Sequence, residues 1–170
     1  MKKILLLSDT HGCIDAQILK YVEQADEVWH AGDIGDLVVT DTIKKSKPLR
    51  AVYGNIDGKE ARAEFTEDLS FHCEGVSVFM THIGGYPGKY VTRVKAELQR
   101  RRPKLYICGH SHILKVQYDQ AIGTLHLNPG AAGISGFHQV RTMLRFVIDG
   151  AELKDMEVIE FAKSKKAESF

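Results

Sequence analysis

Short runs of consecutive apolar residues recur along the first two thirds of the chain, separated by more polar stretches. Apolar residues that follow one another without alternation predict strands that are covered on both faces of a sheet. The predicted strands are Lys3–Leu7, Glu27–His30, Leu49–Tyr53, Val76–Met80 and Leu105–Cys108.

Between these strands, apolar residues recur at the spacing of one helix face. Helices are predicted over Ala16–Gln24, Leu37–Lys45 and Val91–Arg101, and Asp36 is placed to cap the second of them. Strands that alternate with helices in this way predict βαβ units.

The last third of the chain predicts antiparallel hairpins instead. The dipeptides Ile122-Gly123 and Asp149-Gly150 each separate two strand-like segments, and Asp-Gly is a strong hairpin-turn signal. The paired segments are Lys115–Ala121 with Thr124–Leu127, and Met143–Ile148 with Glu152–Ile159. The chain is therefore expected to begin as α/β and to end in hairpins.

A chain of 170 residues is long enough for one domain with a real core. We expect that domain to span residues 1–162, followed by a C-terminal tail at 163–170. The fractions of apolar (44%) and charged (26%) residues are ordinary for a soluble globular protein. The net charge of +1 provides no general attraction to nucleic acid or to an anionic membrane.

The N-terminus and the cysteines indicate the cellular compartment of the protein. The apolar run Ile4–Leu7 ends at Ser8, short of the roughly seven residues that the core of a signal peptide needs. No apolar run is long enough to span a membrane. Cys13, Cys73 and Cys108 form no CxxC pair, and a sparse, odd count of cysteines indicates reduced thiols. We therefore expect a cytoplasmic protein.

Side chains that can bind metal follow the predicted strands, and sites in α/β sheets gather where strands end. These residues are Asp9, His11, Asp33, Asn55, His82, His110 and His112. Carboxylate, imidazole and amide ligands without thiolate suit Mn, Fe, Co, Ni or Zn better than Ca or Cu(I). The sequence thus predicts a metal site at a sheet edge. Four histidines match no such position and are assigned structural or surface roles: His30, His72, His126 and His138.

The order of these residues, Asp-x-His, Gly-Asp, Gly-Asn, His and Gly-His-x-His, resembles the calcineurin-like metallophosphoesterases. The short chain and the segment Asn128-Pro129-Gly130-Ala131 resemble the small bacterial and archaeal phosphodiesterase branch of that family. The resemblance implies an α/β fold (α+β by some schemes): a four-layer αββα sandwich of two mixed β-sheets flanked by helices.

The resemblance also implies two metal ions that share one carboxylate. Asp9, His11, Asp33 and His112 would hold the first ion, and Asp33, Asn55, His82 and His110 the second. Asn55 would also offer its amide to the substrate phosphate. Manganese is the first expectation, with Ni, Zn, Fe and Co as alternatives. A hydroxide bridging two such ions could attack a phosphoester in line, which needs no side-chain nucleophile.

Two departures from the family bear on the substrate. Ile56 stands where larger relatives have a histidine that can protonate a leaving group, and Ile83-Gly84 replace a Gly-His pair, so no general acid is assigned. With few cationic groups nearby, a singly charged small phosphodiester is expected to be hydrolysed better than a phosphomonoester. The loop 84–90 reads equally well as a substrate loop or as a simple connection.

Other functions are weighed on specific features. A non-catalytic scaffold of the same fold, like the retromer subunit, would be favoured by loss of a ligand, yet all seven are present. A nuclease would draw on the basic cluster 100–104, which a helix C-terminus explains by its dipole. A phosphomonoesterase and a homo-oligomer stay open. A serine-hydrolase elbow at Ser111 is disfavoured because Ile113 replaces its last glycine, and the chain has no P-loop motif for nucleotide hydrolysis.

Overall fold

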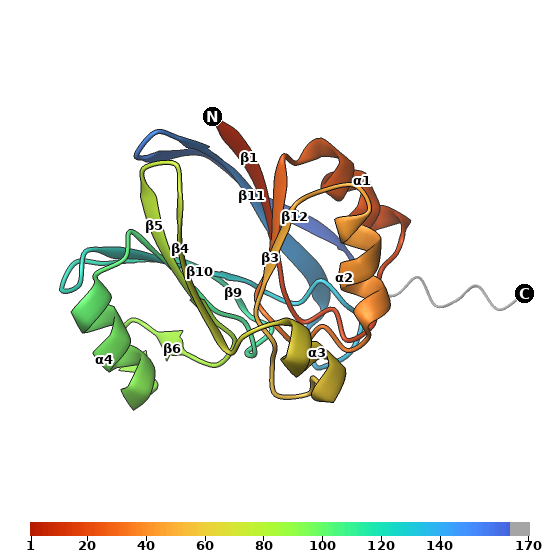
Figure 1. Ribbon diagram of the computed structural model, residues 1–170, viewed down its shortest axis with the longest axis horizontal. Helices are drawn as coiled ribbons and strands as arrows, with labels where there is room; N and C mark the ends of the chain where they lie inside the picture. Colours follow the sequence, from red (N-terminus) through yellow and green to blue (C-terminus); the bar gives the residue numbers. More distant parts are fainter. Residues whose placement is uncertain (164–170) are drawn as a thin grey trace, which may run out of the picture.

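Two five-stranded sheets face each other in the computed structural model, which describes residues 1–163 (Figure 1). The first sheet has the strand order β12-β11-β1-β2-β3. Its strands are β1 (Lys2–Leu7), β2 (Glu27–His30), β3 (Leu49–Ala51), β11 (Val140–Asp149) and β12 (Glu152–Ala162). The second sheet has the order β4-β5-β8-β10-β9. Its strands are β4 (Asp68–Cys73), β5 (Val76–Thr81), β8 (Leu105–Ile107), β9 (Leu114–Asp119) and β10 (Thr124–Pro129).

Each sheet combines parallel and antiparallel pairing, so the expected mixed sheets are confirmed. Strands β1, β2 and β3 are parallel, as are β5, β8 and β10. Both C-terminal hairpins form, with Gly123 and Gly150 in the left-handed conformation at their turns. The two hairpins belong to different sheets, because β10 pairs with β8 of the second sheet whereas β11 pairs with β1 of the first. The strands predicted at Val76–Met80 and Leu105–Cys108 are β5 and β8, which are neighbours inside the second sheet.

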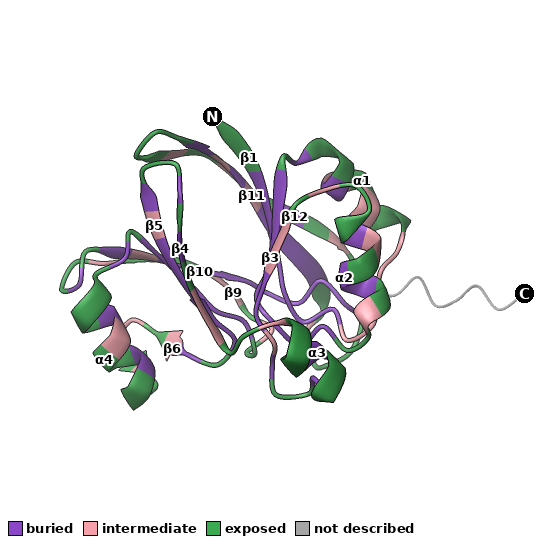
Figure 2. Cartoon of the chain, viewed as in Figure 1, coloured by how far each residue is buried: buried purple, intermediate pink, exposed green. Residues whose placement is uncertain are grey.

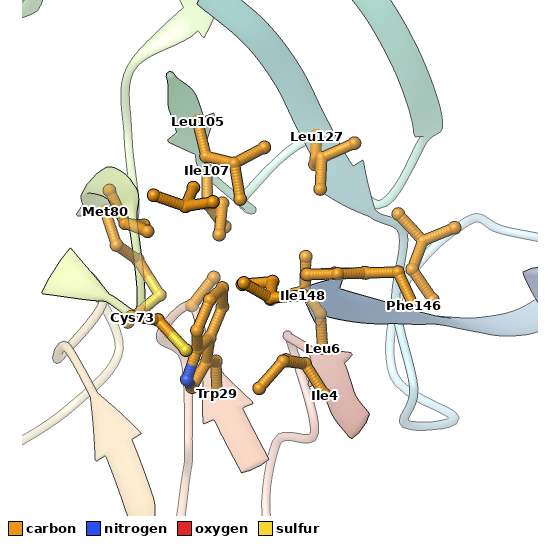
Figure 3. Packing of buried hydrophobic residues seen from close by; sticks show 14 of the residues in the cluster. Ile4, Leu6, Trp29, Cys73, Met80, Leu105, Ile107, Leu127, Phe146 and Ile148 are labelled. Carbon is orange, nitrogen blue, oxygen red and sulfur yellow. The ribbon is translucent and has the colours of Figure 1, made fainter. Parts of the chain in front are cut away.

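Packing explains why Ile4–Leu7 of β1 are all apolar. Ile4 and Leu6 enter the core between the two sheets, whereas Leu5 and Leu7 enter a second core beneath helices. Trp29 from β2 lies in the inter-sheet core, where Figure 3 shows it among side chains of both sheets. Strands with apolar partners on both faces need no polar face, which is the physical reason for the uninterrupted runs.

Helices cover the outer faces of the two sheets and complete the four-layer arrangement. The helices are α1 (Ala16–Gln24), α2 (Leu37–Lys44), α3 (Lys59–Glu64) and α4 (Thr92–Arg101). Helices α1 and α2 pack on the first sheet, and α4 packs on the second through Val94 and Leu98 (Figures 1 and 2). The side chain of Asp36 accepts a hydrogen bond from the backbone N–H of Val38, which confirms the predicted cap of α2.

Several elements were not anticipated from the sequence. They are α3, β4 and a two-stranded hairpin formed by β6 (Gly85–Tyr86) and β7 (Lys89–Tyr90). Helix α3 buries only Ala61 and so lacks an apolar stripe. The strand predicted at Leu49–Tyr53 ends at Ala51, beyond which Val52 makes one isolated bridge to Thr66.

None of the helices within residues 1–163 is both long enough and apolar enough to cross a membrane. Of the tail expected at 163–170, Lys163 is described and the remaining residues lie outside the described part of the chain.

Candidate metal centre

The predicted ligands meet at one end of the sandwich, where loops from both sheets converge (lower centre of Figure 1). Asp9 and Asp33 lie just beyond β1 and β2 of the first sheet, and His82 directly follows β5 of the second. His110 and His112 follow β8. The carboxyl ends of the parallel strands in both sheets therefore point toward a common site.

The first group of ligand atoms comes from Asp9, His11 and His112, which lie within 4.8 Å of one another. The Nε2 atom of His112 is 3.2 Å from Asp9 Oδ1, and that of His11 is 3.9 Å from the same oxygen. The rings of His11 and His112 meet edge to face, with centroids 5.5 Å apart. These three side chains form a candidate site for one cation.

The second group comes from Asp33, His82 and His110. The Nε2 atom of His82 is 3.2 Å from Asp33 Oδ2. That same oxygen is 3.4 Å from Nε2 of His11 in the first group. Asp33 therefore lies between the two groups, the position that a bridging carboxylate would occupy.

Asn55 stands at the exposed rim of the second group. Its Oδ1 atom lies 3.0 Å from Nδ1 of His110. The structure thus brings all seven sequence-predicted residues to one place, with Asn55 next to His110 as the pattern required.

Several buried donor and acceptor atoms in this centre lack hydrogen-bond partners. Their positions show whether a metal ion would fit. Asp9 Oδ1, His11 Nε2 and His82 Nε2 are buried without a hydrogen-bond partner within residues 1–163. Leaving a buried polar atom unpaired costs about 1–3 kcal/mol. Because all three are ligand atoms pointing into the same space, divalent cations would satisfy them together. The residues fit two metal ions.

The backbone at the site is held in an unfavourable conformation. Eight non-glycine residues among 1–163 have positive φ, and five of them belong to the centre: Asp9, His11, Asp33, His110 and His112. Left-handed backbone at non-glycine residues is uncommon and costs on the order of 1–3 kcal/mol each. Such strain collects at functional sites, where the rest of the fold holds it in place.

Hydrogen bonds behind the ligands fix their orientation. The Nδ1 of His82 lies 2.7 Å from the backbone oxygen of Ala31, so Nδ1–H donates to it and leaves Nε2 free to bind metal. Asp9 Oδ2 accepts from the Ser8 hydroxyl and from the backbone N–H of His110. Its other oxygen, Oδ1, is thereby left for a cation.

Two residues that belong to neither ligand group hold the ligand-bearing loops together. The carboxylate of Asp57 accepts from the backbone N–H groups of Ile34, Gly35 and Gly54. It therefore ties the Asp33 loop to the Asn55 loop.

Asn128 does the same for the Gly-His-Ser-His loop. Its side-chain amide donates to the Gly109 carbonyl and to Ser111 Oγ, while its oxygen accepts from Gly130 N–H. Sequence reasoning assigned Asn128 no role at the site, although the Asn-Pro-Gly segment marked its position.

His30 has the structural role expected of it. Its Nδ1 accepts from Gly32 N–H, and its Nε2 lies 2.9 Å from Thr10 Oγ1. Burial lowers the pKa of His30 to about 4, so a neutral imidazole links the loops that carry Asp9 and Asp33.

The electrostatics favour ionised carboxylates. Burial by itself would raise the pKa of Asp9, but the adjacent imidazoles of His112 and His82 bring that pKa below its usual value. Burial likewise opposes ionisation of Asp33, and the adjacent imidazole of His82 lowers its pKa overall. Both side chains are therefore charged at neutral pH, as metal ligands must be.

His138, which was assigned a structural or surface role, lies beside the site. The ring of His138 meets that of His112 edge to face, with centroids 5.2 Å apart, and its Nε2 bonds the Gly133 carbonyl at 2.8 Å. No spacing in the sequence signals this contact, because a loop following β10 brings the two rings together. The basic cluster at 100–104 begins in the last turn of α4, where Arg100 and Arg101 both pair with Glu97.

Comparison with known proteins agrees with this geometry. The family model of the calcineurin-like phosphoesterase superfamily domain matches residues 1–151, and the chain belongs to that family. A curated relative from Mycoplasma pneumoniae, a probable metallophosphoesterase, is 29% identical over 140 residues. The match covers 79% of this chain and 81% of the relative.

Solved structures share the fold. A predicted phosphoesterase from Streptococcus pneumoniae superimposes with a TM-score of 0.69 and 24% identity, covering 95% of this chain and 90% of its own. An archaeal phosphodiesterase gives a TM-score of 0.70 with 20% identity and coverages of 94% and 99%. Vps29 from Entamoeba histolytica, complexed with zinc, gives 0.71 with 17% identity and coverages of 95% and 99%.

Proposed function

We propose that this protein is a phosphodiesterase that uses two divalent metal ions, with manganese as the first candidate. The observation that carries the proposal is the pair of ligand groups joined by Asp33, whose inward-facing atoms include three that are buried and unpaired. A scaffold that needed only its surface would have no reason to keep these atoms unpaired and its backbone strained.

Each ligand has a definite task in this proposal. Asp9, His11 and His112 would hold the first ion, and His82, His110 and Asn55 the second, with Asp33 shared. Two ions so placed supply Lewis-acid activation of water and of the phosphoryl oxygens. Asn55, exposed at the rim, can direct its amide N–H groups at a phosphate oxygen.

The surroundings of the centre favour a singly charged diester over a doubly charged monoester. None of the seven ligands is a lysine or arginine, and among residues 1–163 the cleft beside His110 is lined by one cation, Lys115. Ile56 occupies the place of a leaving-group acid, so substrates with good leaving groups should react best. The general acid stays unassigned.

The test is a metal-reconstitution assay. Protein stripped by chelation should regain hydrolysis of bis(4-nitrophenyl) phosphate with manganese, and the same titration should be run with nickel, zinc, cobalt and iron(II). We expect a higher kcat/KM for the diester than for 4-nitrophenyl phosphate. A monoester preference under every metal would refute the substrate class, and metal binding without any hydrolysis would favour a scaffold.

A further inference from the structure

A cleft of about 250 Å³ opens directly beside the second metal group. His110, a residue of the second metal group, and Ser111 line this cleft, and the β6–β7 hairpin lines it through Gly85 and Tyr86. The cleft is therefore continuous with the place where a phosphoryl group would sit, and the proposed reaction at the metal ions does not use it.

The hairpin wall is held firmly. The hydroxyl of Tyr106 donates to the Gly85 carbonyl at 2.9 Å, and that of Tyr90 donates to Asp119 at 2.6 Å. Gly84 lets the backbone approach so closely that a Cβ there would overlap the Tyr106 hydroxyl. Two anchors on the second sheet keep the cleft preformed, which reduces the ordering cost of binding a ligand.

The lining is apolar and aromatic at the mouth. Ile83, Tyr86 and Ile113 line it with exposed fractions of 40%, 38% and 67%. The described residues that line the cleft include no carboxylate, and their one formally charged side chain is Lys115. Its Nζ atom lies 4.0 Å from the centroid of the Tyr86 ring, so one cation and one aromatic face form a common wall.

The floor adds no competing charge. Cys108 is a buried free thiol, and burial lowers the pKa of His126 to about 4, so His126 is neutral at pH 7. The side-chain amide of Asn128 is already engaged with the loop around Gly109. An apolar, planar group would therefore enter without displacing a charged partner.

We propose that this cleft is the subsite for one aromatic or heteroaromatic ester group of the phosphodiester, bound between Tyr86 and Ile113. The inference rests on the proposed function, since it needs a phosphoryl group at the metals. The cleft is smaller than the usual range for drug-sized ligands, which suits a single ring. Lys115 complements the monoanionic phosphodiester and its electron-rich ring substituents.

Two unreactive phosphonate monoanions test the subsite by binding alone. Methyl phenylphosphonate carries the ring, whereas methyl methylphosphonate lacks it, and calorimetry on the manganese-loaded protein would measure both. We expect the phenyl compound to bind about tenfold more tightly, the gain expected from partly burying one ring. With diamagnetic zinc in place of manganese, its ring current should also shift the NMR methyl signals of Ile113 and Ile83.

Tyr86→Ala and Ile113→Ala should each remove most of that tenfold preference, leaving metal content and the affinity for methyl methylphosphonate unchanged. Tyr118→Ala and Val158→Ala are matched controls, because both side chains are exposed and lie outside the cleft; both should keep the preference. Equal binding of the two phosphonates by a diester-hydrolysing protein overturns the subsite alone. If the protein binds neither metal nor phosphonate, both proposals fall.

Discussion

The Nε2 atom of His82 lies 3.2 Å from Oδ2 of Asp33, although their strands belong to different sheets. Asp33 follows β2 of the first sheet, and His82 follows β5 of the second. A cation bound to both would therefore cross-link the two layers of the sandwich. Ligand binding and fold stability should be coupled through this contact.

Removing metal should lower the thermal stability of the protein. A ligand at one hundred times its Kd stabilises the native state by about 2.7 kcal/mol, and each kcal/mol shifts Tm by roughly 2–4 °C at this size. Scanning calorimetry with and without chelator should thus show a fall of roughly 5–10 °C. The Asp33→Asn variant should show almost none, and an equal fall in that variant would contradict the coupling.

Substitution should separate the two ions. Asp33→Asn removes the shared carboxylate, so both ions should bind more weakly and diester hydrolysis should fall by at least a hundredfold. His112→Ala should chiefly weaken the first ion, and His82→Ala the second. His126→Ala is the control and should keep both. Metal analysis after dialysis distinguishes these outcomes, and full stoichiometry in Asp33→Asn would show that the centre is assigned wrongly.

Gly54 should tolerate no side chain. A Cβ there would overlap Asp33 Oδ1 and the Asp33 backbone nitrogen, so Gly54→Ala should displace the shared carboxylate and cost at least tenfold in affinity for both ions. Gly58→Ala is the matched control, because a Cβ at that position meets nothing within 4 Å. Titration of each variant with manganese provides the comparison, which fails if the two alanines behave alike.

His138 should act by positioning His112. Loss of a group that supports a ligand typically costs 10–100-fold in metal affinity, so His138→Ala should weaken the first ion while sparing the second. His138→Phe keeps an aromatic ring against His112 and should restore much of the loss. If phenylalanine is no better than alanine, the bond from His138 to Gly133, rather than ring packing, supports the site.

Acid should destabilise the protein partly through His126. Burial lowers its folded pKa to about 4 from 6.5, so it is neutral in both states above pH 6.5. As the pH falls from 6.5 toward 4, the unfolded state takes up the proton first, and stability decreases. At pH 5 this effect is about 2 kcal/mol.

Urea unfolding at pH 7.5 and pH 5 measures that loss. His126→Phe should lose about 2 kcal/mol less between the two pH values than the unmodified protein, because it has no proton to gain. His72→Phe, at an exposed position of β4, should lose as much as the unmodified protein. An unchanged pH dependence in His126→Phe would show that the imidazole titrates normally.

The sequence by itself determined the central strands, three of the helices, both C-terminal hairpins and the identity of the candidate metal ligands. Apolar runs, helical spacing and Asp-Gly turns are local features, so a window of a few residues contains the information. Elements with a weak local pattern were not predicted, for the same reason. In α3 only Ala61 is buried, and a six-residue helix with so little apolar surface depends on its tertiary setting.

Only the tertiary structure decided how these pieces combine. That β11 pairs with β1 while β10 pairs with β8 depends on long-range strand pairing, which no local pattern encodes. The placement of His138 against His112, and of Tyr86 in the cleft that His110 also lines, arises in the same way. Local chemistry determined which atoms could bind a cation, whereas packing of the two sheets determined that they meet.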